Sequence, residues 1–280
     1  MKTWQLRNTL WSIPATGGIM GILNVTPDSF SDGGQHTSIP AAIAHARRML
    51  SEGAHIIDIG GESTRPGAAP VSAAEEERRT VPVIAALRQE FPHAILSIDT
   101  RTPSVAAAAL AAGADIINDI TGLASPDMRA LCAARPCGII LMHMQGTPQT
   151  MQLAPTYTDV VAEVRTFFEE RLALAEQAGI SPSRICLDPG IGFGKTTEHN
   201  LALIRNLETL RVADRPILMA LSRKRFMGEI LAAPHLAKNF PLPTVVMSLL
   251  AAQNGADLHR VHDISPLHQA LTLRKALLTP

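Results

Sequence analysis

Residues 94–119 read AILSIDTRTPSVAAAALAAGADIIND and contain a complete strand–helix–strand unit. Two short apolar runs, residues 94–99 and 115–119, each end in polar side chains. Between them, Thr102-Pro103 is a typical helix start and Gly113 a typical helix end. Continuous apolar runs are typical of parallel strands that are buried on both faces. The stretch therefore predicts a right-handed crossover between two parallel strands.

The same unit recurs along the chain. The sequence predicts eight strands, at residues 19–25, 55–60, 94–99, 115–119, 138–144, 184–188, 216–222 and 257–263. Gly53, Gly113 and Gly255 each begin a Gly-Ala step that reads as helix end, tight turn and strand start. Eight such units predict an α/β fold, a (β/α)8 TIM barrel, formed as a single domain by residues 1–280. The alternative is an open doubly wound sheet, but no Gly-x-Gly-x-x-Gly follows the first strand.

Further helix starts are marked by capping residues. Ser38 precedes a helix with Pro40 in its first turn, and residues 72–75 read as a capping box. Ser125-Pro126 and Ser265-Pro266 repeat the pattern of a cap followed by proline. Together these signals predict that helices connect consecutive strands.

Composition narrows the class of protein. Hydrophobic residues make up 46% of the chain and aromatic residues 4%, so we expect a large aliphatic core. A formal net charge of zero gives no basic face for nucleic acid or membrane. Three cysteines, an odd number, favour reduced core thiols over disulfides. The sequence contains no apolar run long enough for a signal peptide or a membrane span, so we expect a soluble, cytoplasmic protein.

Polar residues stand where the predicted strands end. In a barrel these positions surround one mouth, where catalytic groups of this fold lie. Asp58 and Asp119 are left out of the predicted site because side chains alternate in direction along a strand. The predicted ring comprises Asn24, Gly60, Glu62, Asp99, Asn118, His143, Asp188, Ser222, Lys224, Arg260 and His262.

Three features of the loops and strand ends add to this ring. The segments 26–34 and 61–67 are rich in Gly, Ser, Pro and Asp, and they also carry Phe30 and Arg65, which suit a substrate lid. Residues 190–195 lack the spacing of a phosphate loop and are interpreted as a flexible loop with Phe193 as a contact residue. Met142 is either plain core or part of an apolar floor for a flat ring.

Together these motifs resemble the dihydropteroate synthase family. The two longest are GILNVTPDSFSDGG at residues 21–34 and GGESTRPG at residues 60–67. The resemblance extends from residue 21 to residue 263. It also rests on residues 98–100, 117–119, 141–146, 188–195, 222–224 and 260–263.

The resemblance implies an enzyme of folate biosynthesis, a transferase. It would join p-aminobenzoate to 6-hydroxymethyl-7,8-dihydropterin diphosphate, release diphosphate through a dissociative substitution and require Mg²⁺. The implied pterin contacts are Asp99, Asn118, Asp188 and Lys224. The implied diphosphate site comprises Asn24, Thr64, Arg260 and His262, with Asn24 near the metal. Val261 and Met142 are further implied substrate-binding residues.

The remaining implied residues frame p-aminobenzoate, where sulfonamides bind in this family. They are Phe30, Thr64, Arg65, Pro66, Phe193, Ser222 and Lys224. Asp99, Lys224, Arg65 and Asn24 are the implied catalytic residues, with Asp99 stabilising a cationic pterin methylene. Family members are usually homodimers, so we expect one here.

Two departures from the family pattern and two alternatives accompany this resemblance. Ala220 stands where the family usually has glycine, so its methyl group is expected to crowd the pterin pocket. Residues 240–244 read FPLPT, and the two prolines are expected to delay or re-aim the next helix and any subunit contact built on it. The alternatives are a corrinoid-linked methyltransferase domain and a non-catalytic pterin-binding paralogue.

Overall fold

The computed structural model describes residues 2–25, 39–62 and 71–278. Eight parallel strands form a barrel, in the order β8-β7-β6-β5-β4-β3-β10-β9, and the parallel bridge between Leu187 and Ile217 links the two ends of this order. The (β/α)8 barrel is therefore confirmed. The strands are β3 (Gly18–Asn24), β4 (Ile56–Gly60), β5 (Ile95–Asp99), β6 (Ile116–Asp119), β7 (Gly138–Met142), β8 (Ile185–Asp188), β9 (Leu218–Met219) and β10 (Leu258–Val261).

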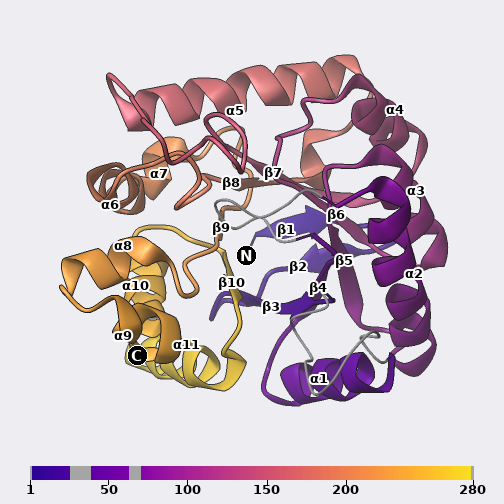
Figure 1. Ribbon diagram of the computed structural model, residues 1–280, viewed down its shortest axis with the longest axis horizontal. Helices are drawn as coiled ribbons and strands as arrows, with labels where there is room; N and C mark the ends of the chain where they lie inside the picture. The colour runs from indigo at the N-terminus through magenta and orange to yellow at the C-terminus, as the bar shows by residue number, and fades with distance from the viewer. Residues whose placement is uncertain (1, 26–38, 63–70, 279–280) are drawn as a thin grey trace.

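Helices surround the strands on the outside of the barrel (Figure 1). None of the described helices is long and apolar enough to cross a lipid bilayer. They are α1 (Ile39–Ser51), α2 (Ala73–Glu90), α3 (Pro103–Ala112), α4 (Pro126–Ala134), α5 (Val160–Gln177), α6 (Thr197–Arg205), α7 (Leu207–Leu210), α8 (Arg225–Ile230), α9 (Pro234–Asn239), α10 (Leu242–Gln253) and α11 (Ile264–Leu278).

The predicted capping residues are confirmed at two helices and corrected at two. The hydroxyl oxygens of Ser72 and Ser125 accept hydrogen bonds from the backbone N–H of the third residue of α2 and of α4, respectively. Thr102 precedes α3, but its hydroxyl donates to a carboxylate oxygen of Glu76 instead of capping the helix. The last helix begins at Ile264, one residue before Ser265, so the pair Ser265-Pro266 lies inside its first turn.

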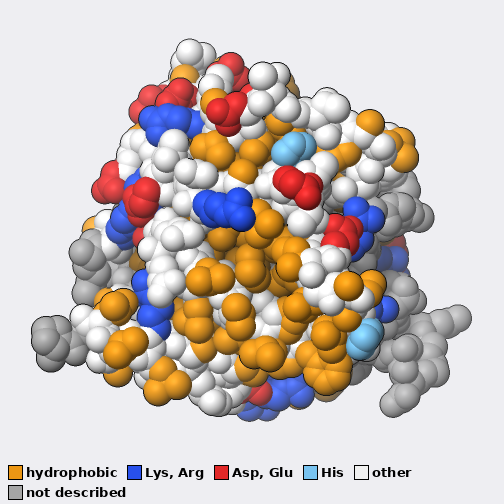
Figure 2. Space-filling view, turned by 90° about the vertical axis from the view of Figure 1, so that its left-hand side faces the viewer, with side chains coloured by type: hydrophobic (Ala, Val, Ile, Leu, Met, Phe, Trp, Pro, Cys, Tyr) orange, Lys and Arg blue, Asp and Glu red, His pale blue; other side chains and the backbone are white. Residues whose placement is uncertain are grey.

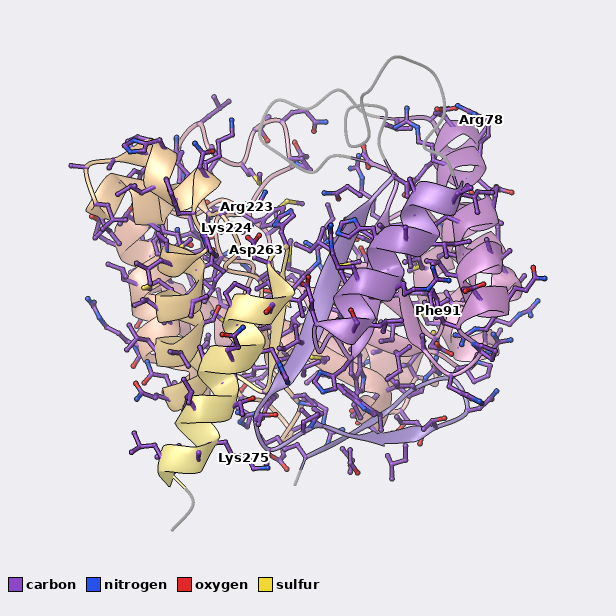
Figure 3. All side chains as sticks on the ribbon, turned by 90° about the horizontal axis from the view of Figure 1, so that it is seen from below. Arg78, Phe91, Arg223, Lys224, Asp263 and Lys275 are labelled. Carbon is purple, nitrogen blue, oxygen red and sulfur yellow. The ribbon has the colours of Figure 1, made fainter. Side chains whose placement is uncertain are left out.

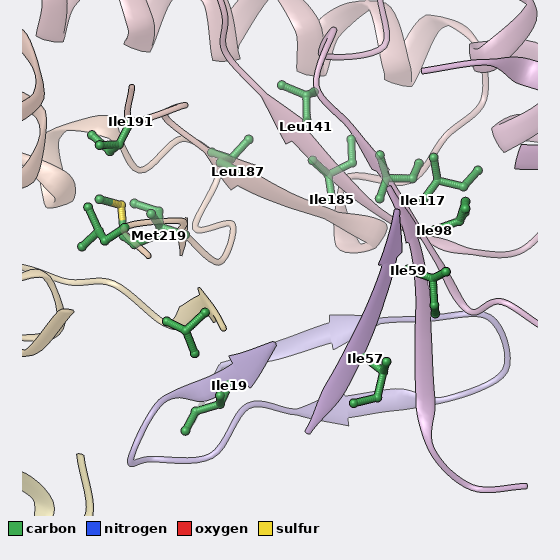
Figure 4. Close-up of a cluster of buried hydrophobic side chains, with 14 of the residues drawn as sticks. Ile19, Ile57, Ile59, Ile98, Ile117, Leu141, Ile185, Leu187, Ile191 and Met219 are labelled. Carbon is green, nitrogen blue, oxygen red and sulfur yellow. The ribbon is translucent and has the colours of Figure 1, made fainter. Parts of the chain in front are cut away.

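An aliphatic layer between strands and helices forms the outer core. Ile57, Ile98, Ile117 and Leu187 alternate with inward-facing residues along their strands, and each is fully buried (Figure 4). Cys132 and Cys137 belong to this layer and are unpaired, as predicted. The low aromatic content is thus compatible with a large core because branched aliphatic side chains fill it.

A second apolar cluster fills the end of the barrel where the strands begin. Each of the eight strands contributes one inward-facing residue: Met20, Ile56, Ile95, Ile116, Ile140, Cys186, Leu218 and Leu258. Below them lies a hairpin of β1 (Thr3–Gln5) and β2 (Leu10–Ser12), which the sequence analysis did not predict. Its Trp4 is fully buried in this cluster and donates its indole N–H to the carbonyl oxygen of Arg184. The hairpin therefore closes the bottom of the barrel.

The proline-rich segment 240–244 contains the start of the helix α10. Pro241 precedes α10 and Pro243 lies in its first turn, where a missing backbone N–H costs no hydrogen bond. Thr244 is buried, and its hydroxyl oxygen accepts a hydrogen bond from the backbone N–H of Arg223 at 3.1 Å. Arg223 has a positive φ of 58°, so this bond supports a strained turn directly before Lys224.

Candidate active site

A cavity of about 690 Å³ opens where the barrel strands end. Inward-facing residues fill the bottom of the barrel, and those further along the same strands line this cavity. Leu258 belongs to the buried core, whereas Arg260 and His262, two and four residues further on, line the cavity. Figure 3 shows Arg223, Lys224 and Asp263 at this end of the barrel, with Lys275 at the other. The polar lining comprises Asn24, Glu62, Asp99, Asn118, Asp188, Ser222, Lys224, Arg260 and His262, together with further residues of the outer rim.

Arg260 is held between two carboxylates. Its Nε lies 2.6 Å from Oδ2 of Asp58, and its Nη2 lies 2.7 Å from Oδ2 of Asp99. Burial acts to lower the pKa of the Arg260 guanidinium, but the two acids outweigh it and raise that pKa. Burial raises the pKa of the Asp99 carboxyl; Arg260 opposes this shift, and Asp58 adds to it. The cation is therefore permanently charged and fixed in orientation.

Asn118 on β6 and Asp188 on β8 each carry a side-chain oxygen that can accept a hydrogen bond. Asn118 at the end of β6 donates its amide Nδ2–H to Oδ2 of Asp58 at 3.2 Å. Asp188 at the end of β8 accepts from the backbone N–H of Gly190 at 2.7 Å. Burial raises the pKa of Asp188, while the Gly190 N–H and the nearby Lys224 oppose the shift. Both side chains are almost fully buried yet line the cavity, so a ligand can reach their remaining acceptor sites.

Two lysines, the buried Lys195 and the partly buried Lys224, flank Asp188. Burial lowers the pKa of Lys224 to about 8, and Asp188 opposes this shift. The Nζ of Lys195 donates to the carbonyl oxygens of Gly190 and Phe193, each at 3.0 Å, and to Nδ1 of His143 at 2.9 Å. The loop interpreted as flexible from its sequence is thus held internally by this ammonium group.

The ring nitrogen of His262 meets the hydroxyl of Ser222. His262 Nδ1 lies 2.9 Å from Ser222 Oγ, which also accepts from the backbone N–H of His262 at 3.2 Å. His143, the predicted member of the ring on β7, is turned away from the cavity and packs edge-on against Phe167. Burial lowers the pKa of His143 to about 3, so its ring is neutral and serves as an acceptor for Lys195.

The structure brings most of the predicted side chains together. Those that line the cavity are Asn24, Asp99, Asn118, Met142, Asp188, Phe193, Ser222, Lys224, Arg260 and His262. Val261 is a correction: its side chain faces the outer core, because it is one residue out of step with Arg260, so only its backbone can contact a ligand. The predicted residues Phe30, Thr64, Arg65 and Pro66 lie outside the described residues.

Asp58, Ile120 and Met151 were not among the predicted site residues. Asp58 points inward one layer below the mouth, whereas Asp119 faces away and accepts hydrogen bonds from residues of the following turn, as expected. Ile120, Met142, Met151 and Phe193 form one apolar cluster at the cavity wall, so Met142 is part of an apolar surface that a flat ring could contact. Ala220 lines the cavity as well, where its methyl group takes up space.

Comparisons with known proteins identify the family. Residues 20–262 match the model of a pterin binding enzyme family. A dihydropteroate synthase of Synechocystis is 49% identical over 260 residues, which covers 92% of this chain and 89% of the relative. The chain belongs to the dihydropteroate synthase family.

Solved structures of this family share the fold over the full length. A dihydropteroate synthase of Xanthomonas albilineans with 4-aminobenzoic acid is 44% identical, with a TM-score of 0.90 and coverage of 100% of both chains. The same enzyme in complex with 7,8-dihydropteroate is 42% identical, with a TM-score of 0.88 and the same coverage. This membership makes the chain a transferase and accounts for the pterin motifs.

The magnesium ion implied for the dihydropteroate synthase family has one suitable side chain here. Within residues 2–25, 39–62 and 71–278, no three His, Cys, Asp or Glu side chains are grouped to hold a metal. Asn24 offers an amide oxygen at the cavity wall, close to Asp99 across Gly60. Mg²⁺ commonly takes few protein ligands and fills its shell with water and substrate phosphates. The donor set therefore fits an ion that enters with a diphosphate.

Proposed function

We propose that this cavity condenses p-aminobenzoate with 6-hydroxymethyl-7,8-dihydropterin diphosphate and releases diphosphate and 7,8-dihydropteroate. The observation that carries the proposal is the single cavity in which buried acceptors, fixed cations and an apolar wall meet. Each of these three parts matches one part of the substrates: the donor-rich pterin edge, the diphosphate and the aromatic ring. Family membership and the relative's complexes with 4-aminobenzoic acid and 7,8-dihydropteroate support it.

The pterin ring is proposed to lie against Asn118, Asp188 and Lys224. An aminopyrimidinone edge offers N–H donors, which the oxygens of Asn118 and Asp188 can accept. Lys224 can donate to ring acceptors from the opposite side. Hydrogen bonds to charged groups contribute about 1.5–3 kcal/mol each, so the two charged members supply most of the polar affinity. Met142 and Ile120 provide the apolar contact for the ring faces.

The diphosphate is proposed to lie toward Arg260, His262 and Asn24. Arg260 is fixed by two acids, yet it lines the cavity and keeps N–H donors that these acids do not use. Thr64, the remaining predicted member, lies outside the described residues. The proposed Mg²⁺ site is Asn24 together with the diphosphate oxygens, where the ion would neutralise charge on the leaving group.

Asp99 is proposed to stabilise the cation that forms as the bond from the pterin methylene to the diphosphate breaks. Its carboxylate lies at the end of β5, beside the Arg260 guanidinium that it shares with Asp58. The p-aminobenzoate amine then attacks the methylene carbon, and its ring is proposed to rest on Phe193 near Ser222 and Lys224. A preorganised charge at the developing cation lowers the barrier without reorganisation.

The chain is further proposed to form a homodimer in the cytoplasm. Figure 2 shows hydrophobic side chains gathered on the side of the molecule that α8 to α11 form in Figure 1. On α10, Leu242, Val246 and Leu250 follow each other at helical spacing with 44–67% of their surface exposed. Leu273 and Leu277 on the neighbouring α11 are 72% and 86% exposed. Adjacent exposed apolar rows of this kind mark protein interaction sites, and a second copy presents the same rows.

The activity is tested by assaying diphosphate release with both substrates and Mg²⁺, omitting each component in turn. Release that requires all of them supports the proposal. Release without p-aminobenzoate indicates a hydrolase. No release, combined with tight pterin binding, indicates a non-catalytic pterin-binding protein. Activity that is unchanged by a strong Mg²⁺ chelator contradicts the metal site.

A further inference from the structure

Asp58 lies directly beneath the active-site cavity without lining it. Its side chain is fully buried, and it points inward from β4 one layer below the mouth. Its Oδ2 accepts hydrogen bonds from Nε of Arg260 at 2.6 Å and from Nδ2 of Asn118 at 3.2 Å. Both partners line the cavity, and they come from β10 and β6. One acid on β4 thus joins residues from two other strands of the barrel.

The contact with Asp58 determines which end of the Asn118 amide faces the cavity. An asparagine side chain carries one donor group and one acceptor oxygen, whereas a carboxylate only accepts. With its nitrogen bonded to Asp58, Asn118 keeps only its oxygen for a ligand. A flipped amide would set two oxygens against each other about 3 Å apart in a buried site, which is costly.

The same acid sets the orientation of Arg260. Asp58 takes the Nε edge of the guanidinium and Asp99 takes Nη2, so two acids from neighbouring strands hold the plane of the group. Without Asp58, the buried Nε–H loses its acceptor and the guanidinium is held by Asp99 alone. The side chain would then rotate about a single contact.

We infer that Asp58 is a positioning residue that sets the hydrogen-bond polarity of the pterin site, making Asn118 an obligate acceptor and fixing Arg260. The inference rests on the proposed function, since it assumes that the ligand is a pterin. The inference predicts that the protein prefers ligand rings that present N–H donors to Asn118. Asp58 causes this preference although the ring never contacts it.

The test is the substitution Asp58→Asn, which changes charge and polarity with little change in volume. We expect the dissociation constant of the pterin diphosphate to rise about 10- to 100-fold, the scale of losing hydrogen bonds to a charged group. Binding of p-aminobenzoate at saturating diphosphate and Mg²⁺, measured by calorimetry, should change less than about threefold. An equal loss for both ligands would mean that Asp58 only stabilises the fold.

A second readout isolates polarity. Pterin and 4-oxopteridine differ in one exocyclic group, the 2-amino donor, which 4-oxopteridine lacks. The native protein should bind pterin more tightly, and Asp58→Asn should reduce this preference at least fivefold because Asn118 becomes free to turn its amide. An unchanged preference overturns the inference.

Ser97 provides a matched control. It is the register partner of Asp58 on β5, is fully buried, and its hydroxyl has no hydrogen-bond partner among the described residues. Ser97→Ala therefore removes a polar atom from the same interior layer without touching Asn118 or Arg260. We expect it to leave the pterin preference and the turnover number unchanged.

A swap keeps the inference testable if Asp58→Asn fails to fold. Asn118→Asp alone places two carboxylates in contact and should abolish pterin binding. Combining it with Asp58→Asn restores an amide–carboxylate pair that still presents an acceptor to the cavity, so binding should return to within about tenfold. No recovery in a folded double variant contradicts the inference. If the native protein itself neither binds pterin nor releases diphosphate, the proposed function fails instead.

Discussion

The ammonium of Lys224 lies over the ring of Phe193, with Nζ 4.3 Å from the ring centroid. The two residues come from loops after different strands, and both line the cavity. Attraction between a cation and an aromatic face contributes about 0.5–2 kcal/mol, more when both are desolvated. The pair therefore fixes a charged group and an apolar contact in one arrangement before substrate arrives.

Replacing Phe193 by leucine keeps an apolar side chain but removes the ring face. We expect the KM for p-aminobenzoate to rise about 3- to 10-fold, with a loss of unfolding free energy below about 2 kcal/mol. Steady-state kinetics and urea denaturation measure the two effects. Phe91→Leu is the control, since Phe91 has a comparable cation contact with Arg47 far from the cavity. A similar change in KM there would contradict the assignment.

Lys195→Met tests the internal support of the loop after β8. Without the ammonium, the carbonyl oxygens of Gly190 and Phe193 lose a buried donor, so the KM for both substrates should rise at least about fivefold. Lys238→Met, at an exposed position on α9, is the matched control and should leave both KM values unchanged.

The same variant gives a pH dependence of defined sign. Burial lowers the pKa of Lys195 to about 7, well below its usual 10.5. Between these values the unfolded chain binds one more proton than the folded protein, so the native stability rises with pH. The difference in unfolding free energy between native protein and Lys195→Met should shift toward the native protein by up to about 1.4 kcal/mol per pH unit above pH 7. Denaturation curves at pH 7 and pH 9 measure it, and a shift of opposite sign excludes the interpretation.

Asp99→Asn is expected to lower kcat about 10²- to 10³-fold, because the amide cannot stabilise the developing pterin cation. The KM for p-aminobenzoate should change little. The ion pair with Arg260 is also lost, so thermal unfolding must show that the variant is folded at the assay temperature. An unchanged kcat would remove Asp99 from this role.

Pterin binding should weaken at mildly acidic pH because of Asp188. Burial raises the pKa of this carboxyl above its usual value, so it takes up a proton at a higher pH than an exposed aspartate. A ligand that needs the carboxylate must then displace that proton, and its dissociation constant rises up to about tenfold per pH unit below the raised pKa. Fluorescence titration between pH 5 and pH 8 measures this. Asp188→Asn should bind more weakly and lose most of the pH dependence, and a dependence equal to the native one would contradict the assignment.

The apolar rows on α10 and α11 predict how the proposed dimer is broken. Leu250→Glu places a charge in the middle of the exposed rows and should produce monomers, measured by sedimentation velocity. Leu10→Glu, at an exposed leucine of the N-terminal hairpin, is the control and should not change the sedimentation coefficient. Native protein that sediments as a monomer would rule out the dimer.

Much of the barrel could be predicted from the sequence, because each strand is a compact apolar run between capped helices. The alternation of side chains along a strand correctly excluded Asp119 from the predicted site, but it does not show how deep in the barrel a side chain lies. Asp58 was left out on the same ground, and wrongly, since it faces inward and lies one layer below the mouth. The strands of the N-terminal hairpin are three residues long, too short to show a hydrophobic period. The role of Lys195 depends on three backbone and ring acceptors that no local pattern reveals.

The hairpin beneath the barrel has a kinetic consequence. Because Trp4 and its neighbours fill the end of the barrel where the strands begin, a ligand reaches the cavity from the end where the strands finish, which Phe193 and Lys224 line. A ligand bound by Asn118 and Asp188 at the strand ends lies deeper in the barrel than a ligand bound by the loops that carry Phe193 and Lys224. We therefore expect ordered binding, in which a ligand at the strand ends enters before, and leaves after, a ligand held by those loops.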